Sequence, residues 1–150
     1  MREPGDLLSL LAAGERNVDV LADGHALGSV AQAVLRHAQA EGADVLVAAS
    51  PSAERIVGAA LMLAPDMLRG LRSAEVVSGD DVVLLIDINL ASGTAMATTA
   101  RHVRKLGARH VVGAVMHFLS DRAPSARDCG LDVLSVFGTS PETTPCQQGA

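Results

Sequence analysis

The chain has almost no aromatic residues. It contains no tryptophan, no tyrosine and 2 phenylalanines among its 150 residues. Proteins that bind single-stranded nucleic acid by base stacking need aromatic platforms, and a net charge of −5 gives no general attraction to a phosphate backbone. We therefore expect no nucleic-acid partner, and a hydrophobic core built from aliphatic side chains and methionine.

Cysteine is also scarce, with 2 residues in the chain, and the histidines are scattered. Neither Cys129 nor Cys146 lies in a metal-ligand motif, and no two of the 5 histidines have the spacing of a ligand pair on a helix. We expect no metal site made of these side chains, and reduced thiols as in a cytoplasmic protein.

Long apolar runs are missing as well. No run reaches membrane-spanning length, and the first residues do not resemble a signal peptide. We therefore expect a cytoplasmic protein with no membrane partner. The length suits one domain, which we predict over residues 1–138, followed by a polar and flexible tail at 139–150.

Helical and strand patterns alternate along the chain. Apolar residues recur with a helical period in some segments, and short continuous apolar runs typical of buried parallel strands lie between them. This alternation predicts an α/β fold, a parallel sheet flanked by helices on both faces. We predict helices over residues 7–11, 27–40, 50–64 and 94–106, and strands over 17–22, 44–49, 76–77, 82–86, 111–116 and 133–137.

The most informative segment follows the apolar run 82–86. That predicted strand ends at one carboxylate, Asp87, and a loop of small residues then leads into a helix that starts near Thr94. A helix N-terminus directs unpaired N–H groups and its positive dipole end at an anion. Ser92 and Thr94 add hydroxyl donors, and Gly93 lets the backbone approach an oxyanion closely. The order predicts a site for a phosphorylated sugar.

The segment from Asp87 to Ala95, Asp-Ile-Asn-Leu-Ala-Ser-Gly-Thr-Ala, resembles the phosphoribosyl-diphosphate-binding motif of type I phosphoribosyltransferases. It is most similar to the Asp-Pro-Met-Leu-Ala-Thr-Gly-Gly-Ser of the uracil phosphoribosyltransferases. It keeps the acid, the Leu-Ala pair and the glycine. It departs at Ile88, where many members have a second acid, and at Ala95, where they have a hydroxyl. The resemblance implies a phosphoribosyltransferase-like fold with a reduced hood and flexible loop.

The resemblance also implies a role for each residue of the segment. Asp87 would be the catalytic carboxylate, binding the ribose hydroxyls or a Mg²⁺ hydration shell. Mg²⁺ would arrive with the diphosphate, and no residue is assigned as its direct ligand. The 5-phosphate of phosphoribosyl diphosphate would be bound by Asn89, Ala91, Ser92, Gly93, Thr94 and Ala95.

A second loop follows the predicted strand 44–49. In phosphoribosyltransferases a loop in this place binds the diphosphate, although the glycine pair often found there is absent here. An ordinary helix cap by Ser50, with Pro51 in the first turn, explains the same residues equally well, and both interpretations stay open. The residues that the resemblance assigns to the diphosphate loop are Ala49, Ser50, Ser52, Ala53 and Arg55.

Three functions are consistent with these patterns. The first is an active phosphoribosyltransferase, which transfers ribose 5-phosphate to a nitrogenous base. The second is a regulatory or partner subunit that binds phosphoribosyl diphosphate or a nucleotide 5'-phosphate without turnover. The third is an unrelated α/β phosphate-binding domain.

Three further expectations follow from the resemblance. Residues 65–81 leave little length for a lid that closes over the ligand. Phe118 and Asp121 are candidates for a contact with the base. We also expect a homo-oligomer.

Overall fold

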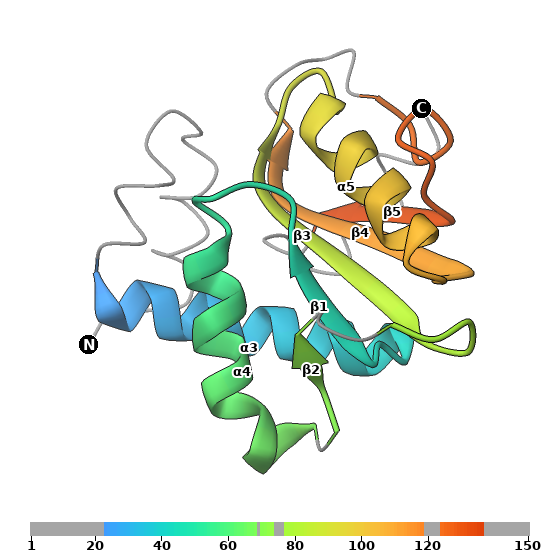
Figure 1. The fold of residues 1–150 in the computed structure, drawn as a ribbon. Helices are drawn as coiled ribbons and strands as arrows, with labels where there is room; N and C mark the ends of the chain where they lie inside the picture. Colours follow the sequence, from blue (N-terminus) through green and yellow to red (C-terminus); the bar gives the residue numbers. More distant parts are fainter. Residues whose placement is uncertain (1–22, 69, 74–76, 119–123, 137–150) are drawn as a thin grey trace.

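The structure is a computed structural model, and it describes residues 23–68, 70–73, 77–118 and 124–136. Within these residues the chain forms a five-stranded parallel sheet with the strand order β2-β1-β3-β4-β5 (Figure 1). The predicted α/β fold is confirmed. The elements are α3 (Gly24–Glu41), β1 (Val45–Ala48), α4 (Glu54–Met67), β2 (Arg72–Ser73), β3 (Val82–Leu90), α5 (Thr94–Lys105), β4 (His110–Phe118) and β5 (Val133–Val136).

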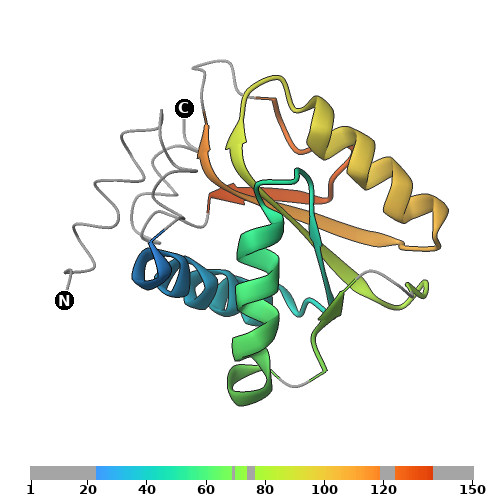
Figure 2. The same cartoon turned by 60° about the vertical axis from the view of Figure 1, so that its left-hand side comes forward.

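Helices cover both faces of the sheet, as predicted. Helices α3 and α4 pack together on one face, and α5 lies on the other (Figures 1 and 2). Because side chains alternate along a strand, each central strand contributes to two cores. The α3/α4 core includes Leu84, Ile86, Val112, Ala114 and Met116. The α5 core includes Val83, Leu85, Val111, Val115, Met96, Ala100 and Val103.

The direction in which successive strands are added reverses between β1 and β3. From β1 the chain passes through α4 to β2 at one edge, and from β3 it passes through α5 to β4 on the other side. In open parallel sheets, ligands bind outside the carboxyl ends of the strands at such a switch point. The loops after β1 and β3 are the two that the sequence singles out, and both lie at these carboxyl ends.

The central strands β3 and β4 extend beyond their neighbours. Pairing of β1 with β3 ends at Ala48 and Ile86, whereas pairing of β3 with β4 continues to Leu90 and Phe118. The carboxyl ends of β3 and β4 form a two-stranded extension that bends away from the rest of the sheet (Figures 1 and 2). Asp87 is the first residue of β3 beyond the end of β1.

Three of the predicted boundaries are wrong. Strand β3 does not end at Asp87 but continues to Leu90, so residues 88–90 belong to the strand and not to the predicted loop. Helix α4 begins at Glu54, one turn after Ser50, and it continues past Pro65 to Met67. The edge strand β2 lies at Arg72–Ser73 and not at 76–77. The predictions for residues 7–11, 17–22 and 139–150 lie outside the described part of the chain. No helix within the described ranges is long and apolar enough to cross a membrane.

Candidate functional site

Asp87 is a buried carboxylate at the switch point, with only 6% of its surface exposed. Its Oδ1 accepts a hydrogen bond from the Ser50 hydroxyl at 2.7 Å and another from the backbone N–H of Ile88 at 2.8 Å. The first bond joins the loop after β1 to strand β3 across 37 residues of sequence. No described residue donates to Oδ2, so this oxygen can accept a hydrogen bond from a ligand.

The loop after β1 uses several of its backbone donors internally. The N–H of Ala49 donates to Ile86 at 2.8 Å and so extends the β1–β3 ladder. The N–H of Ala53 donates to the Ser50 carbonyl at 3.1 Å and points at the Ser50 hydroxyl at 3.4 Å, and Glu54 donates to the carbonyl three residues earlier. Few N–H groups of this loop are therefore left to bind a diphosphate.

The other residues assigned to diphosphate binding differ in access. Ser52 is half-buried, Ala53 is completely buried, and Arg55 is exposed on the first turn of α4. The guanidinium of Arg55 is the only charged donor in the assigned set. Diphosphate binding by this loop stays a prediction.

The loop after β3 presents two hydroxyls to solvent at the start of α5. The side chains of Ser92 and Thr94 lie 3.0 Å apart, and the N–H of Thr94 approaches Ser92 Oγ at 3.3 Å. Both residues are exposed, as are Ala91 and Ala95. The first-turn N–H groups of an α-helix lack intrahelical acceptors and carry the positive end of its dipole. The arrangement suits a phosphate group.

Gly93 has a packing role that the sequence pattern did not reveal. It is buried, with φ of 80°. A Cβ at this position would lie 2.7 Å from Pro124 Cγ and 2.9 Å from Cys129 Sγ. Pro124 and Cys129 therefore cover the Cβ side of Gly93, while Ser92 and Thr94 on either side of it are exposed. Burial, aided by the charge of Asp128, raises the pKa of the Cys129 thiol and keeps it protonated.

The remaining predicted residues occupy the end of the extension. Asn89 is half-buried and pairs in register with His117 of β4. Phe118 is the last residue of β4, and Asp121 lies outside the described residues. The sequence pattern predicts no role for His117, because no two histidines have the spacing of a ligand pair on a helix. The strand register that places His117 beside Asn89 is a long-range property.

The described residues of the site do not supply the ligands of a protein-bound metal ion. Among the described residues, no group of three or more His, Cys, Asp or Glu side chains could hold a metal. Asp87 is the only carboxylate among the residues assigned to the phosphate and diphosphate sites, and its Oδ1 already accepts two hydrogen bonds. Mg²⁺ needs near-octahedral oxygen ligands, and in phosphate sites the substrate supplies several of them. The residues present do not fit a resident Mg²⁺ ion.

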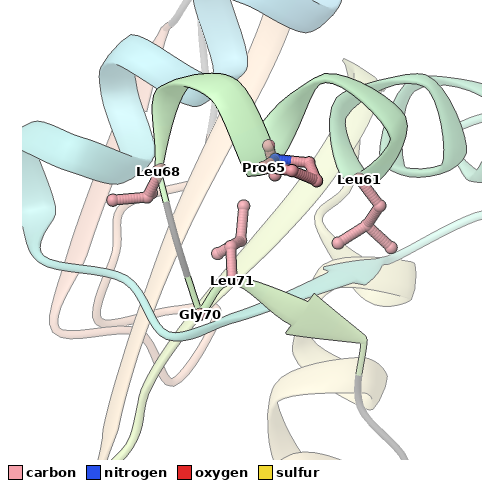
Figure 3. A pocket seen from close by; sticks show the side chains of 6 residues that line it. Leu61, Pro65, Leu68, Gly70 and Leu71 are labelled. Atoms are coloured by element: carbon pink, nitrogen blue, oxygen red, sulfur yellow. The ribbon is translucent and has the colours of Figure 1, made fainter.

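An apolar hollow lies at the other end of the sheet. Its volume is ≈ 400 Å³, and it lies between the C-terminal end of α4 and the start of β2 (Figure 3). Because β2 pairs with Val45, the first residue of β1, the hollow lies near the opposite end of this strand from Ser50, which comes two residues after Ala48, the last residue of β1. Ligand sites combine apolar walls with a few polar groups, and every lining side chain here is apolar or glycine. The lining residues are Leu61, Ala64, Pro65, Leu68, Gly70 and Leu71.

No protein-family model matches the chain, and no curated protein matches its sequence. The fold and the site define an α/β protein with a doubly wound parallel sheet and a polar cluster at its switch point.

Proposed function

We propose that this protein binds a 5'-phosphorylated ribose, as found in phosphoribosyl diphosphate and in nucleotides, at the carboxyl ends of β1 and β3. One observation carries the proposal. The buried carboxylate of Asp87 lies at the switch point, and five residues later along the chain Ser92 begins an exposed pair of hydroxyls, Ser92 and Thr94, at the N-terminus of α5. A sugar phosphate needs a carboxylate for its hydroxyls and neutral or positive donors for its phosphate.

The phosphate would bind at the start of α5. Both hydroxyls can turn from their mutual bond to donate to phosphate oxygens, and the N–H groups of Ala95 and Met96 belong to the first turn of the helix. Hydrogen bonds to an ionised acceptor are roughly twice as strong as neutral ones. The dipole of α5 favours the negative charge at the same place.

The ribose hydroxyls would donate to Asp87. Ser50 and the Ile88 N–H hold Oδ1 in place, and Oδ2 is left as the acceptor for the sugar. A carboxylate fixed in this way loses little conformational freedom when the ligand binds, and this favours affinity. Ser50 thus positions the acceptor, and the loop after β1 contributes without touching the phosphate.

Binding without transfer is the function that the geometry supports best. Transfer from phosphoribosyl diphosphate requires stabilisation of the charge that develops on the leaving diphosphate. The loop that would supply it uses the N–H groups of Ala49, Ala53 and Glu54 internally. Ile88 occupies the place of the second acid of the family motif. We therefore favour a binding or regulatory role over catalysis.

Calorimetry on the full chain tests the proposal. We expect ribose 5-phosphate and nucleoside 5'-monophosphates to bind, and ribose to bind at least about tenfold more weakly, because it lacks the charged hydrogen bonds. The double variant Ser92→Ala/Thr94→Val should lose this discrimination. Thr98→Val, which changes an exposed threonine of α5, is the matched control.

Two outcomes separate the competing functions. Release of diphosphate from phosphoribosyl diphosphate and Mg²⁺ on addition of a panel of bases would demonstrate catalysis and replace the binding role. Failure of every phosphorylated ligand to bind at millimolar concentration would refute both.

A further inference from the structure

Helix α4 exposes a stripe of side chains that its own chain does not cover. The helix packs against α3 and β1 with its inner side, and its other side lies on the outside of the molecule (Figures 1 and 2). Exposed residues separated by three, four, three and one positions share that outer side. We call them the α4 stripe, and they are Arg55, Gly58, Met62, Pro65 and Asp66. No charged residue lies between the first and the last of them in the sequence.

Met62 lies at the centre of the α4 stripe and contributes little to the core of its own chain. It is 84% exposed, more than any other large apolar side chain of the described residues. The apolar surface continues from the stripe into the hollow at the end of α4, because Pro65 belongs to both and Leu61 lines the hollow beside it (Figure 3). Continuous exposed apolar surface of this kind marks a protein-binding face.

Gly58 has no structural reason within the chain to be a glycine. It lies inside α4, where glycine is less favourable than alanine. A Cβ at this position would have no neighbour within 4 Å. The distance between two packed helices depends on the side chains at their contact, so a glycine on an exposed helix face allows a second helix to come close. Gly58 thus leaves space for a large side chain such as Met62 of another copy.

The charges at the two ends of the α4 stripe favour one orientation of a second copy. Within the described residues neither Arg55 nor Asp66 forms an ion pair. If two copies of α4 pack antiparallel about a two-fold axis, Arg55 of each lies beside Asp66 of the other. The same arrangement places Met62 of each opposite Gly58 of the other. A parallel arrangement would bring like charges together. Glu54 is turned by about 100° from its neighbour on the helix and lies off the stripe.

We propose that the α4 stripe is the interface of a two-fold symmetric homodimer, in which α4 packs antiparallel against α4 of a second copy. A two-fold interface must be complementary to itself, and this patch contains a large side chain, the gap that accepts it and both charges. The proposal does not depend on the binding of a phosphorylated ribose. An interface built on one helix belongs to the small, transient class, so we expect a Kd on the order of 10–100 μM.

Sedimentation equilibrium of the full chain over a range of concentrations tests the proposal. We expect Met62→Lys to weaken dimerisation at least about tenfold, because it places a charge at the apolar centre of the interface. Met67→Lys is the matched control. It changes an exposed methionine of the same helix that lies off the α4 stripe, and it should dimerise as the unaltered protein does. Both side chains are exposed, and circular dichroism should show that both variants keep the fold.

Reversal of the charges tests the antiparallel orientation. Asp66→Arg should weaken the dimer severalfold, because it places two cations side by side, and Arg55→Asp/Asp66→Arg should recover the loss. Equal weakening in the single and the double variant would overturn the orientation.

Two results would overturn the interface itself. One is equal weakening by Met62→Lys and Met67→Lys. The other needs no variant: a monomer mass for the unaltered protein at millimolar concentration would show that a second copy does not occupy this face.

Discussion

Gly93 and Cys129 are packed so closely that no other residue fits at position 93 without movement. A Cβ on Gly93 would lie 2.9 Å from the Cys129 sulfur, and the glycine has φ of 80°, in the left-handed region. The loop that precedes α5 is therefore anchored to the segment between β4 and β5. This contact fixes the position of Ser92 and Thr94 on either side.

We predict that Gly93→Ala destabilises the fold more than a Gly→Ala change at another glycine with positive φ whose Cβ position has no close neighbour. The left-handed backbone alone costs about 1–2 kcal/mol for a residue with a side chain. The clash with Pro124 and Cys129 adds about 1–3 kcal/mol of overpacking. Urea unfolding measures the difference.

Gly42→Ala is the matched control for that prediction. Gly42 also has a positive φ, of 68°, but a Cβ there would have no neighbour within 4 Å. Equal losses of unfolding free energy in the two variants would show that the packing around Gly93 is not tight.

The Ser50–Asp87 hydrogen bond predicts a stability effect that can be measured without a ligand. Ser50→Ala leaves the buried carboxylate with the Ile88 N–H as its remaining described donor on Oδ1. Loss of a hydrogen bond to a charged group costs about 1.5–3 kcal/mol. Denaturant unfolding should show this loss for Ser50→Ala and little change for Ser52→Ala, a half-buried serine of the same loop. Similar stability of the two variants would contradict the assigned bond.

Asp81 predicts a dependence of stability on acid pH. The backbone N–H of Ser78 is the main group that holds the pKa of Asp81 below its ordinary value, and the Arg72 side chain adds to the effect. A carboxyl whose pKa is lower in the folded state stabilises the fold above its unfolded pKa of about 3.9, and this stability is lost as the pH falls through the folded pKa.

Asp81→Asn should therefore lower the unfolding free energy at pH 7, and the difference from the unaltered protein should shrink below about pH 4. Asp80→Asn, in the same turn but exposed, is the control. The Ser78 N–H lowers the pKa of Asp81 more than the Arg72 side chain does. Arg72→Gln should therefore reduce the unfolding free energy less than Asp81→Asn does. If the unfolding free energies of Asp81→Asn and the unaltered protein differed by the same amount at every pH in this range, the prediction would be refuted.

Much of the fold could be predicted because its central elements have strong local patterns. The helical period over 27–40 and the apolar run at 82–86 are both long, and the structure confirms a helix at Gly24–Glu41 and a strand at Val82–Leu90. The helix start at Thr94 also follows from local order, because small residues precede it. The end of the preceding strand does not, since the strand continues past Asp87 to Leu90.

The errors arose where a distant partner decides the structure. Ser50 looks like a helix cap, but its hydroxyl donates to Asp87, 37 residues away, and α4 starts one turn later. Pro65 looks like a helix terminator, yet the helix continues for two residues beyond it. The cover over Gly93 comes from Pro124 and Cys129, which no local pattern connects to it.

The central claim is that a phosphorylated ribose binds where β3 leads into α5, and amide chemical shifts test it most directly. The full chain, labelled with ¹⁵N, is titrated with ribose 5-phosphate and, as a control, with ribose. The account predicts that the phosphorylated sugar causes its largest shifts at the amides of residues 92–96, with further shifts at Ser50 and Ile88. Shifts confined to the apolar hollow at Leu61 and Leu71, or no shifts at millimolar ligand, would contradict it.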